Sequence, residues 1–269
     1  NGLYFRNAPS DVLQGAVLAG KAIDAGIANM ATIARQDPYG EGLAAAVVKD
    51  FTAAGGNITS ALLYDPAAPS FEAEVAEIVA GAPEAVVVVG FDESTKLIQE
   101  MIKQGAGPDK IQLYLVDGNA STTAFAEFPA GTMTGTVATF PSGSVDVTTF
   151  NDRMLAFDPS LTDFLYGPQS FDATMLIALA AHQAGCADGT SIAANLISVA
   201  GDGGEECTTY ADCVALIDAG TAIDYMGVNG GSDFNQYGDL LEGTISINEY
   251  TSNTEYEEIG SLTAVVPEP

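Results

Sequence analysis

Residues 28–116 alternate between short apolar runs and longer amphipathic runs, and this alternation limits the possible folds more than any other feature of the sequence. The apolar runs predict strands at 28–34, 58–64, 84–90 and 111–116. Between them we expect a helix over 41–54, closed by Gly55-Gly56, and two further helices. Strands that alternate with helices at this spacing are typical of a parallel, doubly wound sheet, so the sequence predicts an α/β fold.

The two further helices each have an expected cap and an expected buried face. Ser70 is expected to cap the first and Asp92 or Ser94 the second. The apolar faces are expected to consist of Phe71, Val75, Ile78 and Val79 in the first helix, and of Leu97, Ile98, Met101 and Ile102 in the second.

Three loops follow the predicted strands at 36–41, 90–93 and 116–119, and they contain Tyr39, Phe91 and Asp117 respectively. Ligands of such sheets bind beyond the carboxyl ends of the strands. We therefore expect two aromatic side chains and one carboxylate to converge on one rim. The alternative for each is structural: a turn aspartate before Gly118, and aromatic rings packed on the core.

The second half of the chain has a different pattern. A β-rich segment over 132–140 precedes four expected helices, and from Ile223 onward short strands and turns take over, the last of them over 243–250. The helices are expected at 145–157, 168–184, 189–200 and 209–219. They have few strands to cover, so this half is expected to need sheet strands that the chain does not contain.

Composition excludes several classes of function. Eight Lys and Arg face 36 Asp and Glu, for a formal net charge of −28, which disfavours nucleic acids and anionic membrane surfaces as partners. Hydrophobic residues make up 47% of the chain, enough for a sizeable core. No run of eighteen apolar residues is present, so the sequence predicts no spanning helix.

No set of residues supports catalysis, and we expect neither an enzyme nor a cofactor. The single histidine, His182, ends an apolar helical run and is expected on a helix surface. The sequence has no Gly-x-Ser-x-Gly motif that would supply a nucleophilic serine for it. Asp233, Asn235, Gly238 and Asp239 partly resemble a calcium loop, but Gln236-Tyr237 interrupts the spacing and no closing Glu follows. A plain turn is the expectation there, and no metal site is predicted.

The three cysteines indicate one local disulfide. Cys207 and Cys213 have five residues between them, a wider spacing than zinc-ligand pairs usually show. A bridge between the two fits better than a metal site and implies an oxidising compartment. Cys186 is then either a buried free thiol or the partner of a cysteine outside this chain.

Several strings, in order along nearly the whole chain, resemble type I periplasmic binding proteins, the branched-chain amino-acid solute-binding proteins of ABC transporters. The strings resemble the entry to the second lobe, a tyrosine turn, an aromatic-Asp-Ala helix motif, a cysteine-containing segment and a late turn. They are Phe5-Arg6-Asn7-Ala8-Pro9-Ser10-Asp11 with Gln14-Gly15, Asp37-Pro38-Tyr39-Gly40, Ser170-Phe171-Asp172-Ala173, 207–213 with 223–227, and Phe234-Asn235 with Gly238-Asp239.

The resemblance implies two α/β lobes with doubly wound parallel sheets, of which lobe one is incomplete in this chain. It places lobe two at 3–130, the mostly helical remainder of lobe one at 131–227, and a hinge crossing with the final strands at 228–269. The first part of lobe one, with its signal peptide, is expected to be absent. That segment or another protein is then expected to cover the helices of 145–219.

The resemblance also implies a function: capture of an amino acid, branched-chain or a similar small zwitterion, for an ABC permease in the membrane. Asp117 would bind the ligand ammonium, Tyr39 would close over it, Phe91 would form a wall, and Tyr166 and Phe171 would contribute from lobe one. The location implied is extracytoplasmic, periplasm or cell surface, with a lipid anchor on a segment absent here. The alternative is a non-transport descendant, a ligand-sensing ectodomain or an extracellular assembly protein.

Overall fold

A computed structural model describes residues 2–142, 147–201 and 203–266. The chain forms two compact units. Unit 1 comprises Asn1–Ser10, Ser142–Thr244 and Thr263–Pro269, and unit 2 comprises Asp11–Pro141 and Ile245–Leu262. The units therefore interleave along the chain, whereas the expected segments 3–130, 131–227 and 228–269 are consecutive. Residues 245–262 belong with unit 2 because they continue its sheet.

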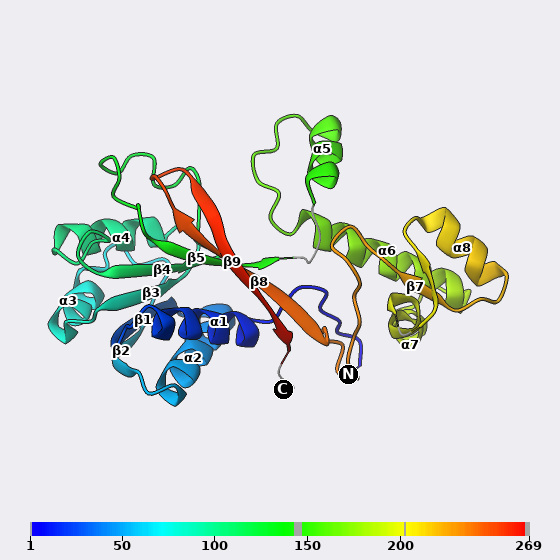
Figure 1. Ribbon diagram of the computed structural model, residues 1–269, viewed down its shortest axis with the longest axis horizontal. Coiled ribbons are helices and arrows are strands. Elements are labelled where there is room, and N and C mark those ends of the chain that lie inside the picture. The colour runs from blue at the N-terminus through cyan, green and yellow to red at the C-terminus, as the bar shows by residue number, and fades with distance from the viewer. Residues whose placement is uncertain (1, 143–146, 202, 267–269) are drawn as a thin grey trace. The chain divides into compact units, whose positions relative to one another are not determined.

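The sheet of unit 2 has seven strands in the order β2-β1-β3-β4-β5-β8-β9 (Figure 1). The pairs β1–β2, β1–β3, β3–β4 and β4–β5 are parallel. The strands are β1 Asn29–Arg35, β2 Asn57–Tyr64, β3 Ala85–Val89, β4 Gln112–Val116, β5 Val137–Ser142, β8 Glu242–Tyr250 and β9 Tyr256–Val265. The predicted α/β class and parallel sheet are confirmed.

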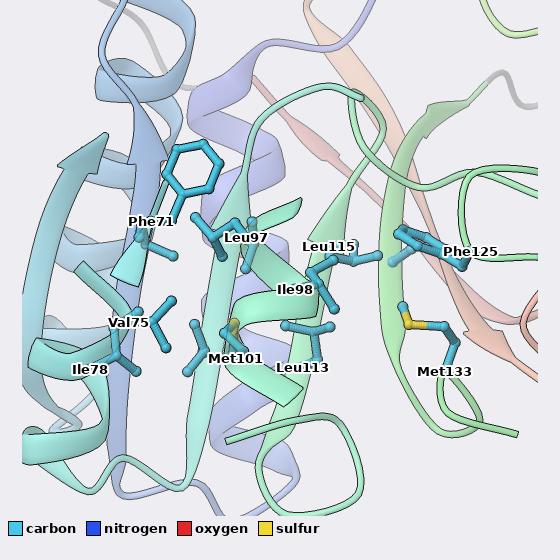
Figure 2. Packing of buried hydrophobic residues seen from close by; sticks show 14 of the residues in the cluster. Phe71, Val75, Ile78, Leu97, Ile98, Met101, Leu113, Leu115, Phe125 and Met133 are labelled. Atoms are coloured by element: carbon cyan, nitrogen blue, oxygen red, sulfur yellow. The ribbon is translucent and has the colours of Figure 1, made fainter. Parts of the chain in front are cut away.

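Helices cover both faces of this sheet. On one face α1 (Asp11–Asp24) and α2 (Pro38–Ala53) bury Leu18, Leu43 and Phe51 against alternate strand residues such as Met30. On the other, α3 (Glu72–Gly81) and α4 (Ser94–Lys103) enclose a second cluster, shown in Figure 2. Every residue of β3 is buried, as expected for a strand covered on both sides.

The predicted strands and helices of 28–116 all form, with bounds within a few residues of expectation, but three details were wrong. Asp92 and Ser94 do not cap α4. Ser94 is the first residue of the helix, it is buried, and its hydroxyl donates to the Phe91 carbonyl at 2.7 Å. In α3, Val79 is 39% exposed and does not belong to the buried face. That face consists of Val75 and Ile78, together with Phe71 just before the helix. Ser70 is not the cap of α3, because Phe71 occupies that position, although the Ser70 hydroxyl accepts from the Glu72 amide at 3.3 Å.

Helix α1 was not predicted, and β9 was covered only by the unspecified final strands of 228–269. Helix α1 packs closely on α2: a Cβ at Gly15 would lie 2.6 Å from the Ala46 Cβ, so glycine permits this approach. Strand β9 lies at the edge of the sheet and is mostly exposed, which is why it lacks the alternating pattern of a half-buried strand.

Unit 1 is mainly helical. Its helices are α5 (Thr148–Phe157), α6 (Gly167–Ala184), α7 (Gly189–Ala200) and α8 (Tyr210–Asp218). Residues 145 and 146 of the first expected helix lie outside the described residues. Strands β6 (Glu205–Cys207) and β7 (Ile223–Tyr225) form a separate two-stranded parallel sheet. In the part of unit 1 that the structure describes, helices therefore outweigh strands, as predicted.

The cysteines and the histidine occupy local structural positions. Cys207, at the end of β6, and Cys213, in the first turn of α8, form the predicted disulfide. Cys186 is an exposed free thiol, so the alternative of a buried thiol was wrong, and pairing with a cysteine outside this chain stays a prediction. His182 lies in the last turn of α6, where its Nε2 is 2.8 Å from Oδ1 of Asp218 on α8, in agreement with a helix-surface role.

The segment with partial calcium-loop spacing is a turn, as predicted. The Asn235 side-chain oxygen accepts from the Tyr237 amide at 2.8 Å and from the Asp239 amide at 3.2 Å. The Asp239 carboxylate pairs with Arg6 at 3.1 Å, which ties the first residues of unit 1 to the turn.

Candidate functional site

The carboxyl ends of β1, β3 and β4 meet at one edge of unit 2 because these strands are parallel neighbours. Tyr39 lies in the first turn of α2, Phe91 follows β3, and Asp117 directly follows β4. The rings of Tyr39 and Phe91 stack, with centroids 5.2 Å apart and planes inclined by 12°. The predicted convergence of these residues is therefore present in the fold, and their role in binding stays a prediction.

Arg35, the last residue of β1, supports Phe91. The guanidinium carbon lies 4.4 Å from the centre of the Phe91 ring, and the guanidinium pairs with Asp37 and, at 2.9 Å, with Glu93. Such cation–π and ion-pair contacts fix both the ring and the arginine. Sequence reasoning did not identify Arg35, because its partner Glu93 is 58 residues away.

Asp37 and Glu93 hold the two loops that carry the aromatic pair. Asp37 caps α2: its carboxylate accepts from the Gly40 amide at 2.8 Å. This hydrogen bond, followed by the contact with Arg35, lowers the pKa of Asp37. Glu93 accepts from the Tyr64 hydroxyl at 3.0 Å and from the Phe91 amide at 3.2 Å. The loop after β3 is therefore fixed from both sides.

Asp117 and Tyr39 form the polar end of the rim. Burial, and then the charges of Asp117 and Asp11, raise the pKa of the Tyr39 hydroxyl well above its usual range. The hydroxyl oxygen is buried and has no hydrogen-bond partner of good geometry among the described residues. A buried polar atom in this state is a candidate ligand contact.

Gly118 allows the loops after β3 and β4 to touch. A Cβ at this position would lie 2.6 Å from the Gly90 carbonyl and 2.8 Å from the Phe91 ring. Any larger residue would therefore force the Gly90 backbone or the Phe91 ring to shift.

Gln14 of α1 is the buried neighbour of Asp117. Its side chain is 1% exposed, and its Nε2 donates to Asp117 Oδ1 at 2.8 Å, to the Thr139 carbonyl at 3.0 Å and to the Thr139 hydroxyl at 3.1 Å. The sequence analysis names Gln14 only within a string that resembles the family, and it predicts no site role for this residue. The available signal was its position between Leu13 and Val17 on the apolar face of a helix.

The remaining predicted site residues belong to unit 1. Phe171 of α6 contacts Phe150 of α5, with ring centroids 5.2 Å apart, and the Arg153 guanidinium lies 5.5 Å from each ring. Tyr166 precedes α6 in the left-handed region, with φ of 60°. Phe171 therefore belongs to an aromatic pair with Phe150 that the Arg153 guanidinium contacts, and the sequence analysis did not predict this arrangement.

Asp172, in the aromatic-Asp-Ala motif, is a buried structural group. Its carboxylate accepts from the Tyr225 hydroxyl at 3.0 Å and from the Val228 and Asn229 amides at 2.9 and 2.8 Å. A Cβ at Gly227 would lie 2.4 Å from its Cγ, so glycine is required in the turn. Burial raises the pKa of Asp172, and the three donors partly offset this effect.

Unit 1 also contains an acidic cavity of about 580 Å³, lined among others by Glu206, Asp224, Asp233 and Glu242. Burial and then the charges of Asp233 and Glu206 raise the pKa of Asp224.

Over residues 2–142, 147–201 and 203–266, no group of three acidic, Cys or His residues has the arrangement of a metal site. In the same ranges no helix has the length and apolarity to cross a membrane.

Comparisons with known proteins identify the family. A sequence model described as periplasmic binding protein matches residues 1–209. The structure resembles a leucine binding protein of Thermotoga maritima (TM-score 0.74, 16% identity, 96% of this chain and 67% of that one). It also resembles an ABC-transporter solute binding protein of R. palustris in complex with benzoate (TM-score 0.73, 15% identity, 98% and 66%).

A curated relative covers less of the chain. An uncharacterized protein of Methanocaldococcus jannaschii is 30% identical over 102 residues, which are 36% of this chain and 24% of that protein. The chain thus spans about a quarter of this relative and about two thirds of the solved structures. The family match extends over most of the chain, and the fold prediction is confirmed by the structural likeness. The chain belongs to the periplasmic binding protein family.

Proposed function

We propose that this chain serves in an extracytoplasmic solute-binding protein that captures an amino acid, branched-chain or a similar small zwitterion, for an ABC permease. Family membership supports solute binding. The observation that carries the amino-acid assignment is the Asp117 carboxylate on the rim beside the stacked Tyr39 and Phe91 rings. A carboxylate in a partly dry site forms charge-assisted hydrogen bonds with an ammonium group.

The charges at this rim favour an amine over an anion. The negative charges of Asp117 and Asp11 both raise the pKa of Tyr39. The nearby cation, Arg35, already pairs with Asp37 and Glu93. One of the similar structures is named for leucine and another is in complex with benzoate. A bare carboxylate such as that of benzoate would meet like charge at Asp117, whereas an α-ammonium would meet opposite charge.

Two features support an extracytoplasmic location. The Cys207–Cys213 disulfide is of a kind that persists in oxidising compartments. The family itself is one of periplasmic proteins. Delivery to a permease and attachment through a lipid belong to the same proposal. Tyr166 and Phe171 of unit 1 are proposed as further ligand contacts on the family resemblance.

The experiment is calorimetric titration of the full chain with the twenty standard L-amino acids, benzoate and 4-hydroxybenzoate. We expect an amino acid to bind and Asp117→Ala to cost about 2–5 kcal/mol of binding free energy. Asp92→Ala is the matched control, because Asp92 is an exposed carboxylate in the neighbouring loop. Binding of the aromatic acids alone, or unchanged affinity in Asp117→Ala, would overturn the assignment.

A further inference from the structure

Gln14 is a fully buried polar side chain that the proposed function does not by itself explain. It is 1% exposed on the apolar face of α1, and its amide donates to the charged side chain of Asp117 at 2.8 Å. We propose that Gln14 is a positioning residue of the ligand site: its amide fixes the orientation of the Asp117 carboxylate. This inference rests on the proposed function, because it assigns a second residue to the same site.

The orientation of the Gln14 amide is determined by its surroundings. Its nitrogen faces the Asp117 carboxylate oxygen and the Thr139 carbonyl, and both of these atoms only accept hydrogen bonds. The opposite orientation would place the amide oxygen against two acceptors. The N–H groups of Gln14 therefore point at Asp117 and Thr139.

Thr139 is a rigid anchor for this amide. It is fully buried in β5 and pairs in register with Val116, the residue before Asp117. The contact therefore joins the carboxyl end of β4 and the middle of β5 to the first turn of α1. A neutral amide is suited to this place because it donates to a carboxylate without neutralising it.

The amide oxygen of Gln14 strengthens the case for a functional residue. It is buried and has no hydrogen-bond partner among the described residues. An unsatisfied buried oxygen opposes folding. An apolar side chain of equal length would avoid that cost, but it would lose the hydrogen bonds to Asp117 and Thr139.

The test is a double-mutant cycle of Gln14→Met and Asp117→Asn in the full chain. The probe is whichever of the twenty standard L-amino acids gives the largest binding heat with the unmodified chain. We expect Gln14→Met to weaken binding roughly tenfold, as for a lost hydrogen bond to a charged group. In the Asp117→Asn background it should change affinity less than about twofold, because its effect passes through Asp117.

Weak binding in the Asp117→Asn background is followed by NMR titration into the millimolar range. Gln14→Asn is a second variant, which keeps the amide but is one methylene too short to reach Asp117. Thr136→Val is the control, since Thr136 is a buried polar residue just before β5, away from the rim. Thr136→Val should leave affinity unchanged.

The outcomes separate this inference from the proposed function. Equal losses from Gln14→Met in both backgrounds, or no loss in either, would refute positioning by Gln14 while leaving amino-acid binding intact. An unmodified chain that binds none of the twenty amino acids would overturn the proposed function and this inference with it.

Discussion

At the scale of single residues, the clearest structural role is that of Asp172, whose carboxylate satisfies three donors from 53 to 57 residues away. Asp172→Ala would leave the Tyr225 hydroxyl and the Val228 and Asn229 amides without this acceptor. We expect unit 1 to lose about 2–4 kcal/mol of stability, since buried donors without partners are costly. Amide hydrogen exchange at Val228 and Asn229, followed by NMR, should then accelerate by more than tenfold. Asp163→Ala, which removes an exposed carboxylate of the same unit, is the control. Unchanged exchange at the two amides would show that the turn does not depend on Asp172.

At the scale of elements, the start of α2 determines where Tyr39 lies, and Asp37 caps that start. Asp37→Ala should lower the free energy of unfolding at neutral pH by about 1 kcal/mol, the usual effect of a lost helix cap. Because the folded-state pKa of Asp37 is lowered, its ionised form stabilises the fold above the unfolded-state pKa of about 3.9, and this contribution disappears as pH falls through the folded-state pKa. The difference between Asp37→Ala and the unmodified chain should therefore shrink in acid, as measured by urea unfolding across a pH series. Asp37→Ser keeps a capping oxygen without the charge, so its stability should depend less on pH than that of the unmodified chain. A difference that grows on acidification would contradict this account.

At the scale of the whole molecule, the net charge of −28 is the dominant property. The Asp and Glu residues outnumber the Lys and Arg residues by 36 to 8, so most carboxylates have no basic group to pair with. Their mutual repulsion disfavours the compact state, and salt screens it. Raising NaCl from about 0.05 M to about 1 M should therefore raise the melting temperature in scanning calorimetry by several degrees. KCl should act equally, since screening depends on ionic strength and not on the cation. A melting temperature that falls or stays constant would show that self-repulsion is not a significant term.

The sequence by itself determined the alternation of strands and helices in unit 2. Each of β1, α2, β2, α3, β3, α4 and β4 is encoded by local apolar periodicity and by turn residues, and both can be read without knowledge of the fold. The expected placement of Tyr39, Phe91 and Asp117 follows from the same information, because parallel strands bring their carboxyl ends to one edge.

The tertiary structure alone decided the contacts between distant segments. Gln14 meets Asp117 across 103 residues, and Arg35 meets Glu93 across 58, so no local pattern could reveal either pair. The position of β9 depends on pairing at a sheet edge, where exposure removes the alternation that marks a strand. The burial of Ser94 likewise depends on what packs around it. Periodicity along a chain specifies which face of an element is apolar, whereas only packing specifies which polar groups that face will meet.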